Sequence, residues 1–169
     1  MYIVEHDEIK DNLRIVVIFG SHGFRCGYVG VDASHPFYKL QYNNYVPIKF
    51  ARKMAETMRG EVGKRGALDV FCTAIGERPL QIGFLFDVHG SITYSEGNNY
   101  PTHNEDGKWW FFGFDCAHHG DAKDYESAEK YGFKMYPEYD FHYGEVREFD
   151  YALQECYSLA KQLSEIKEA

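Results

Sequence analysis

The residues best suited to chemistry gather in one short segment, between Trp109 and Asp121. An apolar run ends there in two carboxylates, two imidazoles and a thiol: Asp115, Cys116, His118, His119 and Asp121. Carboxylates and imidazoles bind divalent metals and move protons, and a thiolate can act as a nucleophile. Polar residues directly after a buried strand lie on a rigid support that solvent can reach. The sequence therefore predicts a pocket of His, Asp and Cys side chains here.

Each of these side chains also has an ordinary structural role. Asp115 can cap a turn, Cys116 can be a small buried hydrophobic residue, and His118 can be a hydrogen-bonded core histidine. Taken singly, each residue favours the structural interpretation. Five such residues within seven positions raise the functional interpretation to equal weight.

A second histidine gives the predicted pocket a metal-binding pattern. His89 precedes a glycine between two stretches rich in β-branched residues, and a histidine at such a bend can face the same pocket. If His89 and His118 converge with Asp115, they form the two-histidine, one-carboxylate set that holds Zn, Mn or Mg with open positions. Metal-assisted hydrolysis would follow, with Asp121 or His119 carrying the proton. The spacing matches no known metal motif, and a bulge with a buried histidine explains His89 equally well.

Four further residues are predicted to contact a ligand: His35, Tyr38, Tyr94 and Cys116. Tyrosine offers a stacking face and a hydrogen-bonding tip, and the loop that carries His35 and Tyr38 is aromatic enough to cover a pocket. A histidine before proline is also typical of a stiff turn. Cys116, paired with a nearby histidine, is an alternative nucleophile, although a histidine two residues away on an extended chain must turn back to reach it.

Composition restricts the class of partner. The formal net charge of -8 over 169 residues repels a phosphate backbone, which argues against extended nucleic acid but not against a pocket for one small anion. No stretch resembles a signal peptide or a membrane span. The four cysteines form no Cys-x-x-Cys pair, so we expect a cytoplasmic protein with reduced thiols, no membrane partner and a small polar or nucleotide-like ligand. Homo-oligomerisation stays open.

Apolar patterns predict the strands that support this pocket. Leu13 to Gly20 and Phe24 to Val31 are rich in β-branched residues around a turn, which predicts a hairpin. Leu80 to Val88 and Ser91 to Tyr94 predict two strand pieces bent at a glycine. The continuous apolar run from Trp109 to Phe114 predicts a central strand covered on both faces.

Helical spacing appears in two places. An insert at about 47–79 carries two short amphipathic patterns, and an apolar stripe from Val146 to Ile166 predicts a long amphipathic C-terminal helix. Between Asp121 and Gly144 we expect an irregular connection with a short helix. The fold class predicted is α+β, with 1–169 as a single domain and an antiparallel or mixed β-sheet packed against helices.

Several motifs resemble, in order, a family of small uncharacterised bacteriophage and prophage proteins. They are Cys26-Gly-Tyr-Val-Gly-Val, His35-Pro-Phe-Tyr, the HG-x-x-TY motif at His89, the WWF-x-GFDCAH-x-GD motif at Trp109 and the helix around Cys156. The resemblance runs from about Phe24 to Leu163 and implies a phage setting, but no reaction. Ser91 replaces a second glycine, and the insert at 47–79 is longer than in many relatives.

Three functions follow as hypotheses from the phage setting and the predicted pocket. The first is a metal-assisted hydrolase of a small phosphate- or nucleotide-containing ligand that counters host defence. The second is a protein that sequesters such a ligand without turnover. The third is an inhibitor that docks on a partner protein through its aromatic residues.

Overall fold

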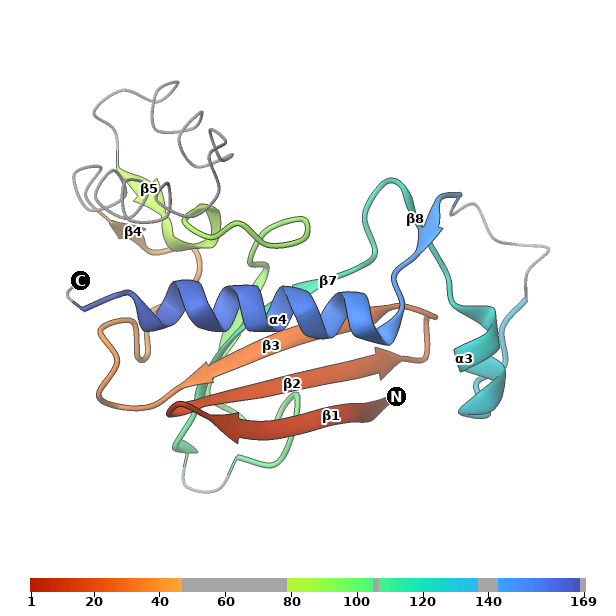
Figure 1. The fold of residues 1–169 in the computed structure, drawn as a ribbon, viewed down its shortest axis with the longest axis horizontal. Coiled ribbons are helices and arrows are strands. Elements are labelled where there is room, and N and C mark those ends of the chain that lie inside the picture. Colours follow the sequence, from red (N-terminus) through yellow and green to blue (C-terminus); the bar gives the residue numbers. More distant parts are fainter. Residues whose placement is uncertain (47–78, 105–106, 137–142, 168–169) are drawn as a thin grey trace.

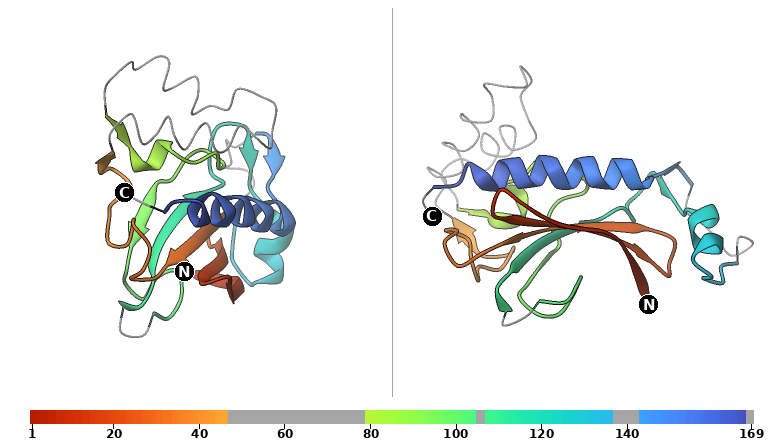
Figure 2. Two further views of the ribbon diagram at one scale, coloured as in Figure 1. Left: turned by 60° about the vertical axis from the view of Figure 1, so that its left-hand side comes forward. Right: turned by 60° about the horizontal axis from the view of Figure 1, so that its bottom comes forward.

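The computed structural model describes residues 1–46, 79–104, 107–136 and 143–167. The fold is α+β, with a five-stranded antiparallel sheet in the order β1-β2-β3-β7-β6 and a long helix, α4, lying across one face of it (Figures 1 and 2). The sheet strands are β1 (Tyr2–Lys10), β2 (Leu13–Gly20), β3 (Arg25–Val31), β6 (Tyr94–Glu96) and β7 (Trp110–Asp115). Residues 47–78, almost all of the expected helical insert, lie outside the described residues.

The predicted hairpin is confirmed as β2 and β3, which pair from Leu13 opposite Val31 to Phe19 opposite Arg25. Its apolar residues do not alternate with polar ones because the strands are covered on both faces. Val17 belongs to the core beneath α4, whereas Val16 belongs to a second cluster on the opposite face, and both are fully buried.

The predicted central strand is also confirmed, because β7 lies between β3 and β6. Phe112 and Phe114 face the main core, and Phe111 faces the opposite cluster with Trp109. The strand ends at Asp115, so the polar segment that follows begins at the end of a central strand of the sheet.

The amphipathic C-terminal helix is confirmed as α4 (Phe149–Ser164), which packs on β2 and β3. It starts three residues later and ends two earlier than the apolar stripe predicts, because Val146 pairs in a strand instead. Gly27 of β3 permits the close approach of helix and sheet, since a Cβ at this position would overlap the Cys156 sulfur and the Phe114 ring. The helix buries six residues: Ala152, Cys156, Leu159, Ala160, Gln162 and Leu163.

The prediction of two strand pieces between Leu80 and Tyr94 is wrong for most of that segment. β5 (Leu80–Gln81) pairs with β4 (Tyr45–Val46), a 3-10 turn, η1 (Ile82–Phe84), follows, and the chain is irregular as far as β6. The buried residues Ile82, Leu85 and Phe86 stand three and four positions apart, which is turn rather than strand spacing. This irregular segment carries His89.

The connection after β7 contains the expected short helix. β8 (Asp121–Ala122) pairs in parallel with β9 (Glu145–Val146), and α3 (Tyr125–Lys130) lies between them in the sequence, at the end of the molecule seen on the right of Figure 1. Within the described residues, none of the helices combines the length and the apolar character needed to cross a membrane.

A buried arginine holds α3 against the sheet. Arg25 forms a two-pronged pair with Glu5 of β1, through Nε at 2.8 Å and Nη2 at 3.0 Å, and these side chains are 4% and 5% exposed. Its Nη1 donates to Asp124 at 2.7 Å and to the backbone carbonyl of Arg147 at 3.2 Å. Asp124 caps α3 by accepting the Ser127 N–H. One guanidinium therefore connects β1, β3, α3 and the chain leading to α4.

Candidate active site

Asp121 is the centre of the polar cluster and is almost fully buried, with 1% of its side chain exposed. Its Oδ1 accepts the Nε–H of Arg147 at 2.8 Å. Its Oδ2 accepts the backbone N–H of His118 at 2.9 Å and lies 2.7 Å from Nε2 of His89. Burial alone would raise the pKa of Asp121, but these hydrogen bonds outweigh it and lower the pKa below the ordinary value of 3.8. Asp121 is therefore a carboxylate at neutral pH.

The imidazole of His89 connects Asp121 to a tyrosine of α4. A carboxylate only accepts hydrogen bonds, so Nε2 of His89 carries the hydrogen and donates it to Asp121. In the neutral ring Nδ1 is then an acceptor, and it lies 2.9 Å from the hydroxyl of Tyr151. Tyr151, His89 and Asp121 thus form a continuous chain of hydrogen bonds: phenol, imidazole, carboxylate.

The irregular segment around His89 is fixed to α4 at two points. The Gln162 side chain accepts the N–H of Asp87 and donates to its carbonyl, both at 2.8 Å. Glu155, two turns earlier on the helix, accepts the backbone N–H of His89 at 2.7 Å. These contacts hold His89 in place although its segment has no regular secondary structure.

Arg147 reaches the site through the pairing of β8 with β9. That pairing places Glu145 beside Asp121, and Arg147 follows two residues later. Its guanidinium carbon lies 4.8 Å from the centroid of the Tyr151 ring, and Nη1 donates to Glu145 at 2.7 Å. Burial and the charge of Glu155 raise the pKa of Tyr151, and Arg147 only partly opposes them. Tyr151 is therefore a protonated phenol at neutral pH.

The structure places His118 beside His89. The rings of His89 and His118 have centroids 5.4 Å apart, and Nε2 of His118 lies 3.8 Å from Oδ1 of Asp115. That Nε2 is buried without a hydrogen-bond partner because it faces the Cα of Gly90, where a Cβ would overlap the ring. The backbone of Gly90 has a φ of +70°, a conformation that favours glycine.

These three predicted metal ligands do not fit a metal ion as they are arranged. Both ring nitrogens of His89 are engaged, so a metal would have to displace Asp121 or Tyr151. Nε2 of His118 faces a glycine. Among the residues that the structure describes, no three His, Cys, Asp or Glu side chains are placed to hold a metal. The metal requirement therefore stays a prediction.

Cys116 and His119, which the sequence places in the same cluster, differ in environment. Cys116 is buried, and burial, reinforced by the charge of Asp121, raises the pKa of its thiol far above the ordinary value. A thiolate nucleophile at this position is therefore disfavoured. His119 lies exposed in the turn between β7 and β8.

Three residues that the sequence predicts to contact a ligand, His35, Tyr38 and Tyr94, lie away from the site. His35 accepts the N–H of Phe37 on Nδ1 and donates from Nε2 to the carbonyl of Leu163, twelve residues along α4 from Tyr151 and roughly 18 Å away at the rise of a helix. The Tyr38 hydroxyl donates to the carbonyl of Gly107 at 2.9 Å. All these contacts stabilise loops.

Tyr94 is likewise remote from His89. Its ring packs with Tyr28 and Tyr100 in the cluster on the face of the sheet opposite α4. Its hydroxyl donates to the side chain of Asn98 and to the carbonyl of Tyr100. Tyr94 therefore does not share a cavity with His89 and His118, as a ligand contact at their site would require.

Three residues of the site went unrecognised in the sequence: Arg147, Tyr151 and Glu155. They stand four residues apart: Tyr151 and Glu155 lie on one line along the surface of α4, and Arg147 precedes the helix by two residues. The pattern Arg-x-x-x-Tyr-x-x-x-Glu beside the apolar stripe of α4 was the signal that could have indicated a polar surface facing another part of the chain.

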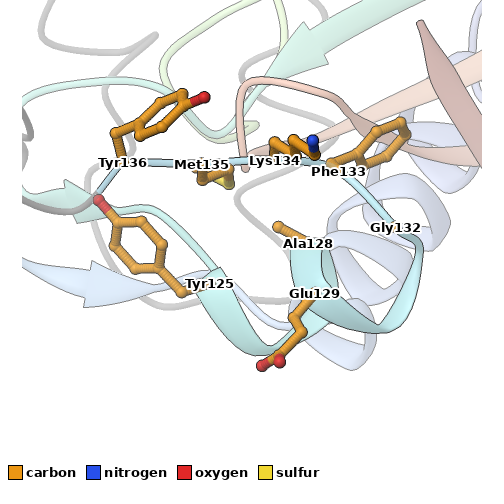
Figure 3. A pocket seen from close by; sticks show the side chains of 8 residues that line it. All are labelled: Tyr125, Ala128, Glu129, Gly132, Phe133, Lys134, Met135 and Tyr136. Atoms are coloured by element: carbon orange, nitrogen blue, oxygen red, sulfur yellow. The ribbon is translucent and has the colours of Figure 1, made fainter.

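A hollow of about 490 Å³ lies elsewhere, between α3 and the segment that follows it (Figure 3). It is lined by Tyr125, Ala128, Glu129, Gly132, Phe133, Lys134, Met135 and Tyr136. In Figure 3 the rings of Tyr125 and Tyr136 lie at one end of the hollow and Phe133 at the other. None of the predicted site residues lines it, so the hollow and the His89 cluster are separate features.

Comparison with models of protein families, with curated proteins and with solved structures gave no match for this chain. The resemblance to phage and prophage proteins therefore stays a prediction.

Proposed function

We propose that the protein hydrolyses a small phosphodiester by general acid–base catalysis, with His89 as the base. The observation that carries this proposal is the hydrogen-bonded chain Tyr151–His89–Asp121, with distances of 2.9 Å and 2.7 Å. A base within reach of a hydroxyl and held in turn by a third group is the arrangement that activates oxygen nucleophiles.

Each member of the chain has a defined task. Asp121 fixes the tautomer of His89, so that the lone pair of Nδ1 points at a hydroxyl, and its negative charge stabilises the imidazolium that forms when His89 takes a proton. Because Asp121 is buried, this charge is little screened by water. His89 returns the proton to the leaving group in the second half of the reaction.

The charges around the site favour a substrate with a single negative charge. Arg147 offers the guanidinium that suits a phosphate oxygen. Three further carboxylates belong to the site: Glu145 accepts from Arg147, Asp115 lies 3.8 Å from His118, and Glu155 accepts the backbone N–H of His89. Their negative charge opposes a dianionic phosphomonoester or a polyphosphate. A small phosphodiester, such as a cyclic nucleotide, adds only one negative charge to these acidic surroundings, where Arg147 is already paired with Asp121 and Glu145.

The same proposal includes the setting inferred from the sequence: a phage-encoded protein in the host cytosol that acts against host defence. Cys26, Cys116 and Cys156 are free thiols, which fits a reducing compartment. Sequestration of the ligand without turnover and inhibition of a partner protein are the alternatives, and both leave a phosphodiester intact.

The test is release of p-nitrophenolate from bis(p-nitrophenyl) phosphate by the purified protein, with and without EDTA. We expect turnover that EDTA leaves unchanged and that Asp121→Asn lowers by about 10³- to 10⁴-fold, because the wrong tautomer of His89 is then favoured. Asp150→Asn is the matched control, because Asp150 is an exposed carboxylate in the first turn of α4 to which no role in the site is assigned, and we expect less than a threefold change.

Two results would overturn the proposal. One is intact substrate after prolonged incubation with the wild-type protein, which would favour the binding alternatives. The other is full activity in a folded Asp121→Asn variant. Loss of activity in EDTA and its return with Zn, Mn or Mg would show instead that hydrolysis is metal-assisted.

A further inference from the structure

We infer that Tyr151 is the nucleophile of this reaction and that hydrolysis passes through a covalent phosphotyrosyl ester. The inference rests on the proposed function and adds the identity of the attacking atom. The feature that carries it is the placement of the Tyr151 hydroxyl on the only ring nitrogen of His89 that Asp121 leaves as an acceptor.

The geometry puts the phenol where an activated water would otherwise be. Nε2 of His89 is bound to Asp121, so a proton can be taken up only at Nδ1. Nδ1 lies 2.9 Å from the hydroxyl oxygen of Tyr151, within the range for direct proton transfer. A water molecule could reach this nitrogen only by displacing the phenol, so the phenol is the nucleophile that needs no rearrangement.

The surroundings of Tyr151 suit a phenolate that exists only during attack. The guanidinium of Arg147 lies over the Tyr151 ring, 4.8 Å from its centroid. The hydrogen bond to Asp121 raises the pKa of Arg147 above its ordinary value, so Arg147 stays positively charged. This charge stabilises the negative charge that develops on the phenolic oxygen. Because the resting phenol is protonated, its nucleophilicity depends on His89.

The position of Tyr151 in the first turn of α4 supplies rigidity. Ala152, the next residue, is fully buried against the core, so the helix backbone at this point cannot shift without disturbing the core. The irregular segment that carries His89 is tied to the same helix through Glu155 and Gln162. Nucleophile and base are therefore held by one element, as a site that must keep a short distance requires.

The reaction balances in two steps. In the first, the Tyr151 oxygen attacks phosphorus, its proton moves to Nδ1 of His89, and the bond from phosphorus to the leaving oxygen breaks. In the second, water attacks the same phosphorus, the bond from phosphorus to the Tyr151 oxygen breaks, and Nδ1 of His89 returns its proton to that oxygen. The proton that the water loses passes through solvent to the alkoxide released in the first step. The products are a phosphomonoester and an alcohol, and the enzyme is regenerated without an external oxidant or reductant.

The experiment follows the full-length protein mixed with excess bis(p-nitrophenyl) phosphate, by rapid quench in acid and by peptide mass spectrometry. We expect a burst of p-nitrophenolate close to one equivalent per site and a p-nitrophenyl phosphoryl group on the Tyr151 peptide. Tyr151→Phe keeps the ring under Arg147 and should lose both, with a fall in turnover of at least about 1,000-fold.

Tyr157→Phe is the matched control, because Tyr157 stands on the same helix but its hydroxyl donates to Glu8 at 2.6 Å instead of contacting a histidine. It should retain the burst and the adduct. Turnover in wild type without an adduct, together with activity in Tyr151→Phe, would overturn the covalent route while leaving acid–base hydrolysis intact. No turnover in wild type would overturn both.

Discussion

At the scale of single residues, the contact between Gly90 and His118 sets the position of two rings. Nε2 of His118 faces the Cα of Gly90, and the His118 ring lies beside that of His89. The backbone N–H of His118 is also a donor to Asp121. A side chain at position 90 would therefore disturb Asp121, the carboxylate that hydrogen-bonds to His89, through its effect on His118.

We predict that Gly90→Ala destabilises the protein by roughly 2–4 kcal/mol, because it adds a positive-φ strain and a clash with His118. Gly132→Ala is the matched control, since Gly132 has a φ of +75° but nothing within 4 Å of a Cβ, and only the strain of about 1 kcal/mol applies. Urea unfolding of both variants measures the difference. Equal losses of stability would show that the contact with His118 is unimportant.

The thiol of Cys26 gives a second residue-scale prediction. Burial, with help from the charge of Asp115, raises its pKa from 9.0 to about 11. At pH 8 the folded protein then carries about 100-fold less thiolate at this position than the unfolded chain, and iodoacetamide should alkylate Cys26 more slowly by that factor. Peptide mapping with and without urea checks this, and similar rates in both states would contradict it.

At the scale of elements, Arg25 and Arg14 make the same kind of bond in different surroundings. Arg14 of β2 pairs two-pronged with Asp7 of β1, near the surface, just as Arg25 of β3 pairs with Glu5 in the interior. Only Arg25 also reaches α3 and the carbonyl of Arg147. The inner pair therefore determines where α3 and the start of α4 lie.

Arg25→Met should cost about 3–5 kcal/mol of unfolding free energy, because Glu5 is left as a buried charge without its partner. Arg14→Met should cost about 1 kcal/mol or less, since both groups of that pair retain access to water. Thermal and urea unfolding of the two variants measure these values. A loss at Arg14 as large as that at Arg25 would contradict the difference in burial.

Elements with their own periodic pattern could be predicted from the sequence, and elements defined by distant partners could not. The hairpin up to Val31 was located by its β-branched apolar residues around a turn, and helix α4 by its apolar stripe at helical spacing. Strand β1 was missed because Glu5, Asp7 and Glu8 make it look like an exposed segment. They are instead the partners of Arg25, Arg14 and Tyr157, which pairing alone reveals.

The candidate site divides in the same way. Asp121, His89 and His118 were predicted as site residues because they cluster near glycines and at the end of a strand, and the structure places them in contact. Tyr151 was not, since its role depends on a bond across 62 positions of sequence. His35 was expected at the ligand pocket, but it contacts Leu163 near the far end of α4. A histidine in an aromatic loop gives no indication of which end of a helix it contacts.

At the scale of the whole molecule, the response to acid follows from groups spread over the fold. Burial lowers the pKa of His35 below its ordinary 6.5. Burial opposes the ionisation of Asp7, Asp121 and Asp124, but hydrogen bonds from arginine, serine and other partners outweigh it, so their pKa values lie below 3.8. In all four cases the folded protein binds the proton less tightly than the unfolded chain does.

We therefore predict that the unfolding temperature falls with acid in two stages. The stability that neutral His35 contributes is fully present above pH 6.5 and is lost as the pH falls through the lower pKa that His35 has in the folded protein. The stability that the three carboxylates contribute is fully present above pH 3.8 and is lost below it. Melting curves between pH 8 and 2 measure both stages. His35→Gln should remove only the first; if it leaves the first stage unchanged, another group causes it.

Helix α4 contributes Tyr151, Glu155 and Gln162 to a site whose other half, from Asp87 to Asp121, precedes it by dozens of residues. During translation the hairpin of β2 and β3 can pair early, but the phenol and both fixing points of the His89 segment emerge from the ribosome only with this helix. If the proposed function holds, we expect a nascent or truncated copy without α4 to be inert, with activity only after the helix has docked on the sheet.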